Sequence, residues 1–185
     1  MSNHGSFSGN PKTEWLADPD GSDRDMSLLE DFWYDDPNGK RWLAPKGSVI
    51  NGASIPRPLW STVGSPYTDD YRRASIVHDV ACDDSNVKRK DADEMFYEAC
   101  LAGGCSYLQA RLLYAGVRIG AWTGATFPSE SFAKERLLFR VPLVAGIDEQ
   151  FVQSKFHEVA ADLKGLPDDA PISEIDKIIA RHIKF

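Results

Sequence analysis

The chain has 185 residues, of which 42% are hydrophobic and 26% charged, a composition typical of a globular protein that buries its own core. No apolar run approaches the roughly 20 residues of a membrane helix, so we expect no transmembrane segment. Acidic residues number 28 against 21 basic ones, and the net charge of -7 argues against broad nucleic-acid binding.

The first 31 residues are polar and are broken by prolines and an Asp-Gly turn signal. We therefore expect an irregular N-terminal arm over residues 1–31, with a short helix at Met26–Glu30. Residues 1–12 contain no apolar core, so no secretory signal peptide is predicted. This pattern is consistent with a cytoplasmic protein or with export by a route that uses no signal peptide.

A β-hairpin is predicted next. Aromatic segments at 32–34 and 41–43 flank a turn sequence that ends in Asn38-Gly39, where a positive φ costs little. Val49 and Ile50 are expected to form a third short strand, which Asn51-Gly52 ends.

The hydrophobic period then becomes helical. We predict helices over 69–83, 88–102 and 106–122, the last capped by Ser106. The third helix is apolar on most sides, so we expect it to be the most buried, with Leu112 in the core.

The C-terminal region contains a linker and two further predicted helices, at 148–163 and 172–183. Ile175, Ile178, Ile179 and His182 form a stripe on the last one, which either packs on the rest of the protein or binds a protein partner. The expected fold is therefore α+β, with a small antiparallel sheet, a three-helix core and extra C-terminal helices. We divide the chain into the arm, a core domain at 32–122 and an extension at 123–185.

A candidate catalytic pair lies on the first two helices. Asp93 falls on an apolar stripe, and a buried carboxylate is costly unless it has a partner. In an antiparallel hairpin of the two helices, facing residues have numbers that sum to about 172, which brings His78 opposite Asp93. Their hydrogen bond would fix one imidazole tautomer and leave the other nitrogen to accept a proton from water. Asp93 could instead form a structural ion pair with Arg72, Arg73 or Arg89.

A candidate cation site lies beside this pair. Asp79 points about 100° away from His78 on the helix, and with carbonyls of the 47–54 loop it could hold Ca²⁺, which prefers oxygen ligands. The predicted ligands are Asp79, Asn51 and Gly52, because the small loop residues let the backbone approach an ion closely.

Cysteine chemistry is the remaining alternative. Cys82 lies one helical turn from His78, which is also a spacing for a Cys–His nucleophile. The chain has three cysteines, an odd and sparse set, so we expect reduced thiols without a disulfide framework.

Three motifs carry a family resemblance. They are Asn-Gly-Ala-Ser-Ile-Pro-Arg at 51–57, Tyr-Arg-Arg-Ala-Ser-Ile-Val-His-Asp at 71–79 and Ala-Asp-Glu-Met-Phe-Tyr at 92–97. In order and spacing, residues 32–122 resemble the bacterial and phage domain of unknown function DUF1353, a family that implies no established activity. Its loop usually has Asp before Gly-Ala-Ser, and Asn51 in that place predicts weaker cation binding.

A looser resemblance is to phospholipases A₂. In those enzymes a helical His activates water, the next Asp binds Ca²⁺ and an Asp on an antiparallel helix orients the His. The resemblance implies that His78 is the base, Asp79 the metal ligand and Asp93 the orienting group. The 47–54 segment does not match the loop motif of that class.

These observations support three functional hypotheses. The first is a hydrolase with a His78/Asp93 dyad, water as nucleophile and a phospholipid ester as substrate, acting as a bacterial or phage effector. The second is a non-enzymatic binding or assembly module of a phage or secretion system, in which the same residues only fix the fold. The third is hydrolysis of peptide or peptidoglycan by Cys82.

Overall fold

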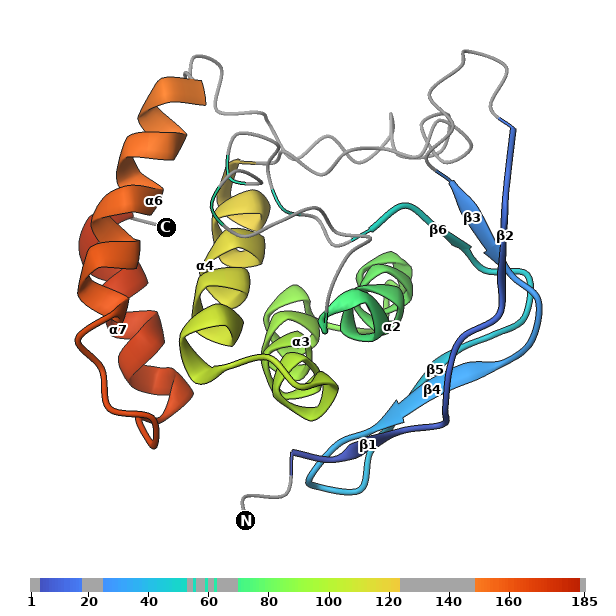
Figure 1. Ribbon diagram of the computed structural model, residues 1–185. Coiled ribbons are helices and arrows are strands. Elements are labelled where there is room, and N and C mark those ends of the chain that lie inside the picture. Colours follow the sequence, from blue (N-terminus) through green and yellow to red (C-terminus); the bar gives the residue numbers. More distant parts are fainter. Residues whose placement is uncertain are drawn as a thin grey trace. The chain divides into compact units, whose positions relative to one another are not determined.

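The computed structural model describes residues 4–17, 25–52, 55, 59, 62, 70–123 and 149–183. Strands come first and helices follow along these ranges, so the α+β class is confirmed (Figure 1). The chain forms two compact units, made of Met1–Ala53 with Pro66–Cys105 and of Ser54–Ser65 with Ser106–Phe185. The division into arm, core and extension stays a prediction.

The first unit contains two antiparallel sheets of three strands each. One has the order β1-β4-β5 and the other β2-β3-β6. Their bounds are β1 Ser6–Phe7, β2 Thr13–Trp15, β3 Met26–Leu28, β4 Phe32–Asp35, β5 Arg41–Ala44 and β6 Val49–Ile50.

The predicted hairpin is confirmed as β4 and β5. Phe32 pairs with Ala44 and Asp35 with Arg41, and the intervening turn is stabilised by Asp36, whose Oδ1 accepts the backbone N–H groups of residues 38 and 40 at 2.9 Å each. Gly39 has φ 81°, the left-handed conformation for which the Asn-Gly signal is typical. The short strand at Val49–Ile50 is also confirmed.

The prediction for the N-terminal region was wrong in two respects. Residues expected to be irregular form β1 and β2, and the helix expected at Met26–Glu30 is instead strand β3. Met26 and Leu28 are buried while Ser27 between them is half-buried, the period-two pattern of a strand. A five-residue helix gains too few hydrogen bonds to form alone, whereas β3 pairs with β2 on one side and β6 on the other.

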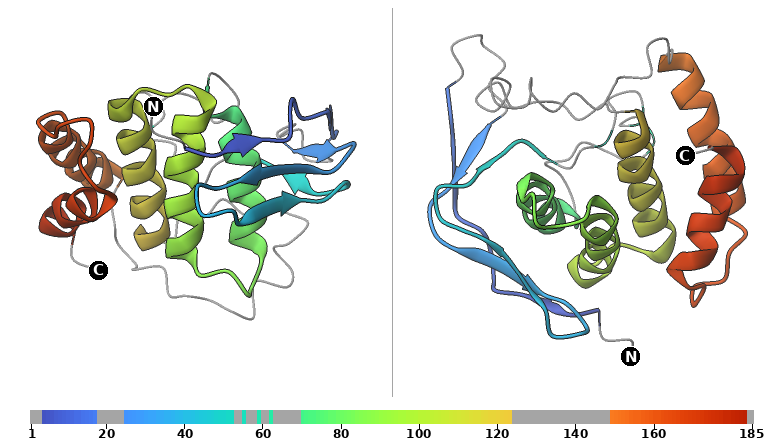
Figure 2. Two further views of the ribbon diagram at one scale, coloured as in Figure 1. Left: turned by 90° about the horizontal axis from the view of Figure 1, so that it is seen from below. Right: turned by 180° about the vertical axis from the view of Figure 1, so that it is seen from behind.

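The described residues of the first unit also form two helices. Helix α2 (Arg72–Asp83) and helix α3 (Arg89–Gly103) pack against each other, and α2 also contacts β4, β5 and β6 (Figure 2). Helix α3 ends at Gly104, which adopts φ 112°. Tyr34, Tyr71 and Phe96 are among the fully buried side chains of this unit, so α2 lies between a layer of strands and α3.

The described part of the second unit contains three helices: α4 (Tyr107–Thr123), α6 (Glu149–Leu163) and α7 (Ile172–His182). Each of the three contacts the other two. The predicted cap is confirmed, because Ser106 Oγ accepts the Gln109 N–H at 3.2 Å. The isoleucine stripe of α7 is buried, as its packing interpretation predicts.

Most described side chains of helix α4 are buried, but Leu112 is less buried than expected. Leu113 and Val117 are fully buried, whereas Leu112 is only half-buried, so Leu112 is not a core residue. The sequence of α4 is apolar on most sides of the helix, so only its contacts with neighbouring elements decide which residues are most buried.

A buried arginine links α4 to the connection between α6 and α7. Arg111 is 2% exposed, and its guanidinium donates to the carbonyls of Leu166, Pro167 and Asp168. Tyr114 Oη donates to Asp176 Oδ1 at 2.7 Å, a polar contact between α4 and α7. Throughout the described ranges, every helix is too short or too polar to cross a bilayer.

Candidate functional site

The candidate site is built on the pair of helices α2 and α3. His78 Nε2 and Asp93 Oδ1 lie 2.8 Å apart, and both side chains are completely buried. The Phe96 ring packs on the imidazole with 4.7 Å between ring centroids. The hydrogen bond predicted from the hairpin geometry is therefore confirmed, while the catalytic role of the two residues stays a prediction.

Arg89 is the second partner of the Asp93 carboxylate. It stands four residues earlier on α3, and its Nε donates to Asp93 Oδ1 at 2.9 Å. The ion pair considered as an alternative to the His78 contact is thus present together with it. Asp93 receives donors from both sides of the helix pair, which offsets the cost of burying its charge.

These contacts set the protonation states of the pair. Burial lowers the pKa of His78, and the Asp93 carboxylate opposes this only in part. Burial by itself would raise the pKa of Asp93, but the hydrogen bond from His78 and the positive charge of Arg89 outweigh it and hold that pKa below its usual value. The site therefore holds a carboxylate and a neutral imidazole that donates its Nε2–H, so that Nδ1 is a proton acceptor.

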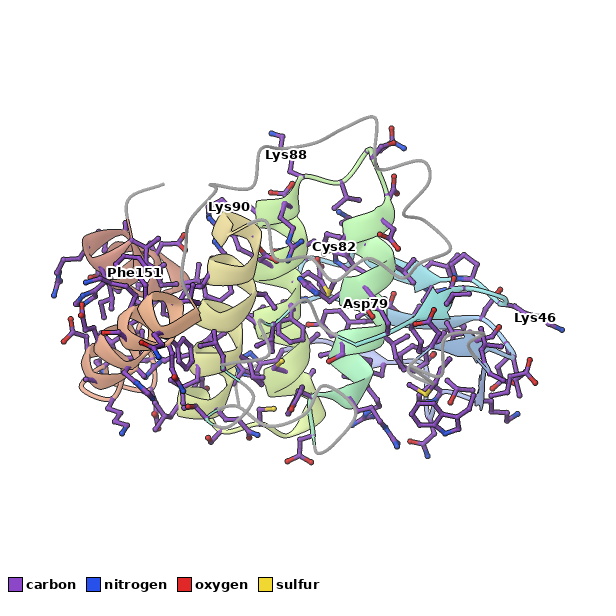
Figure 3. The ribbon with its side chains drawn as sticks, turned by 90° about the horizontal axis from the view of Figure 1, so that it is seen from above. Lys46, Asp79, Cys82, Lys88, Lys90 and Phe151 are labelled. Atoms are coloured by element: carbon purple, nitrogen blue, oxygen red, sulfur yellow. The ribbon has the colours of Figure 1, made fainter. Side chains whose placement is uncertain are left out.

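Cys82 lies next to the His78 imidazole, one turn along α2. Figure 3 labels Cys82 and Asp79 on this helix. Its Sγ is 3.5 Å from His78 Nε2 and 3.8 Å from His78 Nδ1. Burial raises the pKa of this thiol to about 12, so it is protonated at neutral pH. This disfavours the interpretation of Cys82 as a thiolate nucleophile. All three cysteines of the chain are free, as expected.

Asp79 follows His78 on α2 and binds the loop that follows β6. Its Oδ2 accepts the backbone N–H groups of Asn51 at 3.1 Å and Gly52 at 2.7 Å. Burial raises the pKa of Asp79 well above its usual value, although these two hydrogen bonds act in the other direction. Gly52 has φ 95°, the left-handed backbone conformation that favours glycine.

The three residues predicted as metal ligands are in contact, through hydrogen bonds from the loop amides to the Asp79 carboxylate. The loop presents amide donors to the Asp79 carboxylate, and carbonyl oxygens were the ligands expected for Ca²⁺. A metal role for Asp79, Asn51 and Gly52 stays a prediction. Residues 53 and 54 of the same loop lie outside the described residues.

With this geometry in place, the chain can be compared with known proteins. Residues 26–117 match the family described as "Protein of unknown function (DUF1353)". This match confirms the resemblance drawn from the three motifs, with bounds close to those expected. The proposed likeness to phospholipases A₂ is not supported by any of the comparisons.

Two relatives come from Sinorhizobium fredii (strain NBRC 101917 / NGR234). The uncharacterized protein y4jT is 35% identical over 124 residues, which are 66% of this chain and 34% of that protein. The uncharacterized protein y4iH is 37% identical over 139 residues, which are 75% of this chain and 57% of that protein. The chain therefore spans about a third of the length of y4jT and somewhat over half of the length of y4iH. No solved structure matches the chain.

Proposed function

We propose that the protein is a hydrolase in which His78, oriented by Asp93, activates a water molecule for attack on an ester. The supporting observation is the buried contact of 2.8 Å between His78 Nε2 and Asp93 Oδ1, with Arg89 on the same carboxylate oxygen. A positioned carboxylate that selects one imidazole tautomer is the orienting part of a catalytic triad, and water takes the place of the side-chain nucleophile.

The chemical step follows from the tautomer. Nδ1 of the neutral imidazole accepts a proton from water as the water oxygen attacks the ester carbonyl carbon. The imidazolium that forms is stabilised by the Asp93 carboxylate and then returns the proton to the leaving alkoxide. The lowered pKa of His78 supports this role, because the imidazole remains neutral and able to accept a proton at neutral pH.

The proposed substrate is a phospholipid ester, and the proposed setting is an effector of a bacterium or phage. Asp79, Asn51 and Gly52 would bind Ca²⁺ in this scheme, and ion binding would require the loop amides to turn away from the Asp79 carboxylate. Calcium and hydrolysis are separate parts of the proposal and can fail separately.

A second candidate is favoured by the complete burial of the pair. His78 and Asp93 are both 0% exposed, which is also what a fold-fixing polar contact in a binding or assembly module would show. Under the hydrolase proposal, water must reach Nδ1 past the partly exposed Cys82, the side chain that lies 3.8 Å from that nitrogen.

Fatty-acid release from mixed phospholipid vesicles tests the proposal. The full chain should release fatty acid, His78→Gln should abolish release, and Asp93→Asn should reduce it strongly because the amide can stabilise the wrong tautomer. Circular dichroism of each variant separates lost chemistry from lost folding.

The matched control is His182→Gln in the second unit, a histidine that also contacts carboxylates but lies outside the site. It should retain the release rate of the wild-type chain. Release that stops with a chelator and falls in Asp79→Asn would support the Ca²⁺ role, whereas release that persists would remove only the metal. An inactive wild-type chain, with His78→Gln merely less stable, would favour the binding module.

A further inference from the structure

Among the described residues, one group of side chains brings the ligand types of a transition metal together. His78, Cys82 and Asp93 each offer one ligand atom, and the three atoms lie within 4.8 Å of one another. They combine a nitrogen, a sulfur and an oxygen, the mixed set that zinc accepts and that the hard cation Ca²⁺ does not. The cluster is distinct from the loop contact of Asp79.

Two elements of the first unit position these ligands. His78 and Cys82 are four residues apart on α2 and so share one face of the helix, a spacing by which helices often provide two ligands to one ion. Asp93 enters from α3, the helix packed against this face. All three side chains therefore converge on one point between two helices.

The distances suit a single ion near His78 Nε2. With bond lengths of about 2.0 Å to nitrogen and 2.3 Å to sulfur, a tetrahedral zinc ion holds these two ligands about 3.5 Å apart. The separation between His78 Nε2 and Cys82 Sγ is 3.5 Å. Asp93 Oδ1 lies 2.8 Å from the same nitrogen, and this separation would have to lengthen to about 3.3 Å for both atoms to bind one tetrahedral ion.

The geometry points to a site for a zinc-class transition-metal ion on His78, Cys82 and Asp93, in which the ion takes the place of the proton between His78 Nε2 and Asp93 Oδ1. Binding breaks two bonds to hydrogen, the imidazole N–H and the thiol S–H, and both protons pass to solvent. A bound ion deprotonates a coordinating thiol, so a protonated Cys82 in the metal-free protein is no obstacle. A fourth coordination position is left for water.

This site competes with the catalytic arrangement. A metal on Nε2 removes the N–H that Asp93 uses to orient the imidazole, so the metal-bound protein cannot hold the tautomer that activates water. Zinc should therefore inhibit the hydrolase. This consequence rests on the proposed function, whereas metal binding itself does not.

Arg89 acts against the metal. Its guanidinium donates to the same Asp93 oxygen that the ion would bind, and its positive charge repels a cation. Arg89→Gln should consequently bind the ion more tightly than the wild-type chain. Cys82 is the ligand with solvent-exposed surface, and His78 and Asp93 lie beneath it.

Titration of the full chain with Co²⁺, followed by displacement with Zn²⁺, tests the site. A thiolate-to-cobalt charge-transfer band should appear with one ion per chain, and calorimetry in several buffers should show release of about two protons per ion. Cys82→Ala should remove the band. The affinity of this variant for the ion should fall by more than about 10–100-fold, the loss that follows when a residue that only hydrogen-bonds a metal ligand is removed.

Cys105→Ala is the matched control, because it removes a buried thiol of the same unit that is not in the cluster. It should retain the band and the affinity. No band with the wild-type chain, or a band that persists in Cys82→Ala, would overturn the proposal.

A second measurement uses only the wild-type chain, in case Cys82→Ala does not fold. Cys82 is the most exposed of the three thiols, so iodoacetamide should modify it first, and Zn²⁺ should slow that modification about tenfold or more. Equal rates with and without Zn²⁺ would contradict the site. Because binding and protection are read without substrate, a chain that binds Zn²⁺ but hydrolyses nothing would refute the hydrolase alone.

Discussion

The two units of the protein each contain a histidine that joins two helices through carboxylates, and the two contacts differ in burial. In the first unit, His78 and Asp93 are 0% exposed. In the second unit, His182 of α7 binds Glu158 and Asp162 of α6 at 3.1 and 2.9 Å, and these side chains are 19%, 42% and 39% exposed. Similar bond lengths therefore occur in very different surroundings.

The comparison shows that burial, more than bond length, decides what a histidine–carboxylate contact can do. Water screens the charges around His182, so that contact contributes little and responds to salt. The buried pair has no such screening, and the hydrogen bond from His78 together with the charge of Arg89 keeps the Asp93 carboxylate ionised. A fixed tautomer away from bulk water suits a proton acceptor, and for this reason the proposed chemistry is placed on the first contact and not on the second.

The largest expected effect is the loss of the buried carboxylate. Asp93→Ala leaves Arg89 and His78 without their shared acceptor and should cost about 3–5 kcal/mol in the free energy of unfolding, the range for breaking a buried pair. Asp162→Ala, its counterpart in the second unit, should cost about 1 kcal/mol or less. Urea denaturation of both variants measures the difference, and equal losses would refute the comparison.

A second prediction separates two neighbouring leucines of α4. Leu113 is fully buried, so Leu113→Ala should destabilise the protein by about 2–5 kcal/mol. Leu112 is half-buried, so Leu112→Ala should lower the free energy of unfolding clearly less. Thermal unfolding of the two single variants provides the test, and a larger loss for Leu112→Ala would mean that the buried face of α4 is assigned wrongly.

How far the sequence predicts such details depends on the kind of information required. Helical spacing and a short connection were enough to bring His78 opposite Asp93, because both follow from local geometry. Strand β3 was missed, since its stability comes from pairing with β2 and β6, which are distant in sequence. The sequence predicted that Asp79 lies beside the 51–52 loop, but it did not predict that the loop amides donate to the carboxylate. Sequence spacing does not reveal whether a loop turns its amides or its carbonyls toward a side chain.

The pH dependence of stability is the third test. The pKa of His78 is lowered in the folded state from its usual value of about 6.5, so the unfolded chain binds more protons as the pH falls below that value. This residue therefore makes stability decrease as the pH falls from about 6.5 toward its folded pKa. Denaturation from about pH 5 to about pH 8 should show a shallower loss on the acid side for His78→Gln than for the wild-type chain.

Asp79 acts in the opposite direction and has to be separated from His78. The pKa of Asp79 is raised in the folded state, so the folded protein keeps a proton on Asp79 at pH values at which the unfolded chain has lost it. The stability that this proton contributes is lost as the pH rises through the raised pKa. Asp79→Asn should remove that decline. If His78→Gln leaves the acid-side loss unchanged in the Asp79→Asn background, the assignment of a neutral buried imidazole is wrong.

The smallest expected effect concerns the exposed contact. His182→Ala removes both hydrogen bonds to α6 and should change the free energy of unfolding by about 1 kcal/mol or less. The difference from the wild-type chain should shrink further at high salt because the contact is screened. A salt-independent loss as large as that of Asp93→Ala would show that exposure does not distinguish the two contacts.

The tautomer of His78 is the most direct test of the claim that Asp93 prepares this imidazole to accept a proton. Nitrogen NMR of selectively labelled histidine distinguishes the two neutral tautomers and the imidazolium. At neutral pH, the wild-type chain should show a neutral ring with its proton on Nε2, and Asp93→Asn should alter that state while His182→Gln leaves it unchanged. A His78 ring that is charged at neutral pH, or that carries its single proton on Nδ1, would contradict the account.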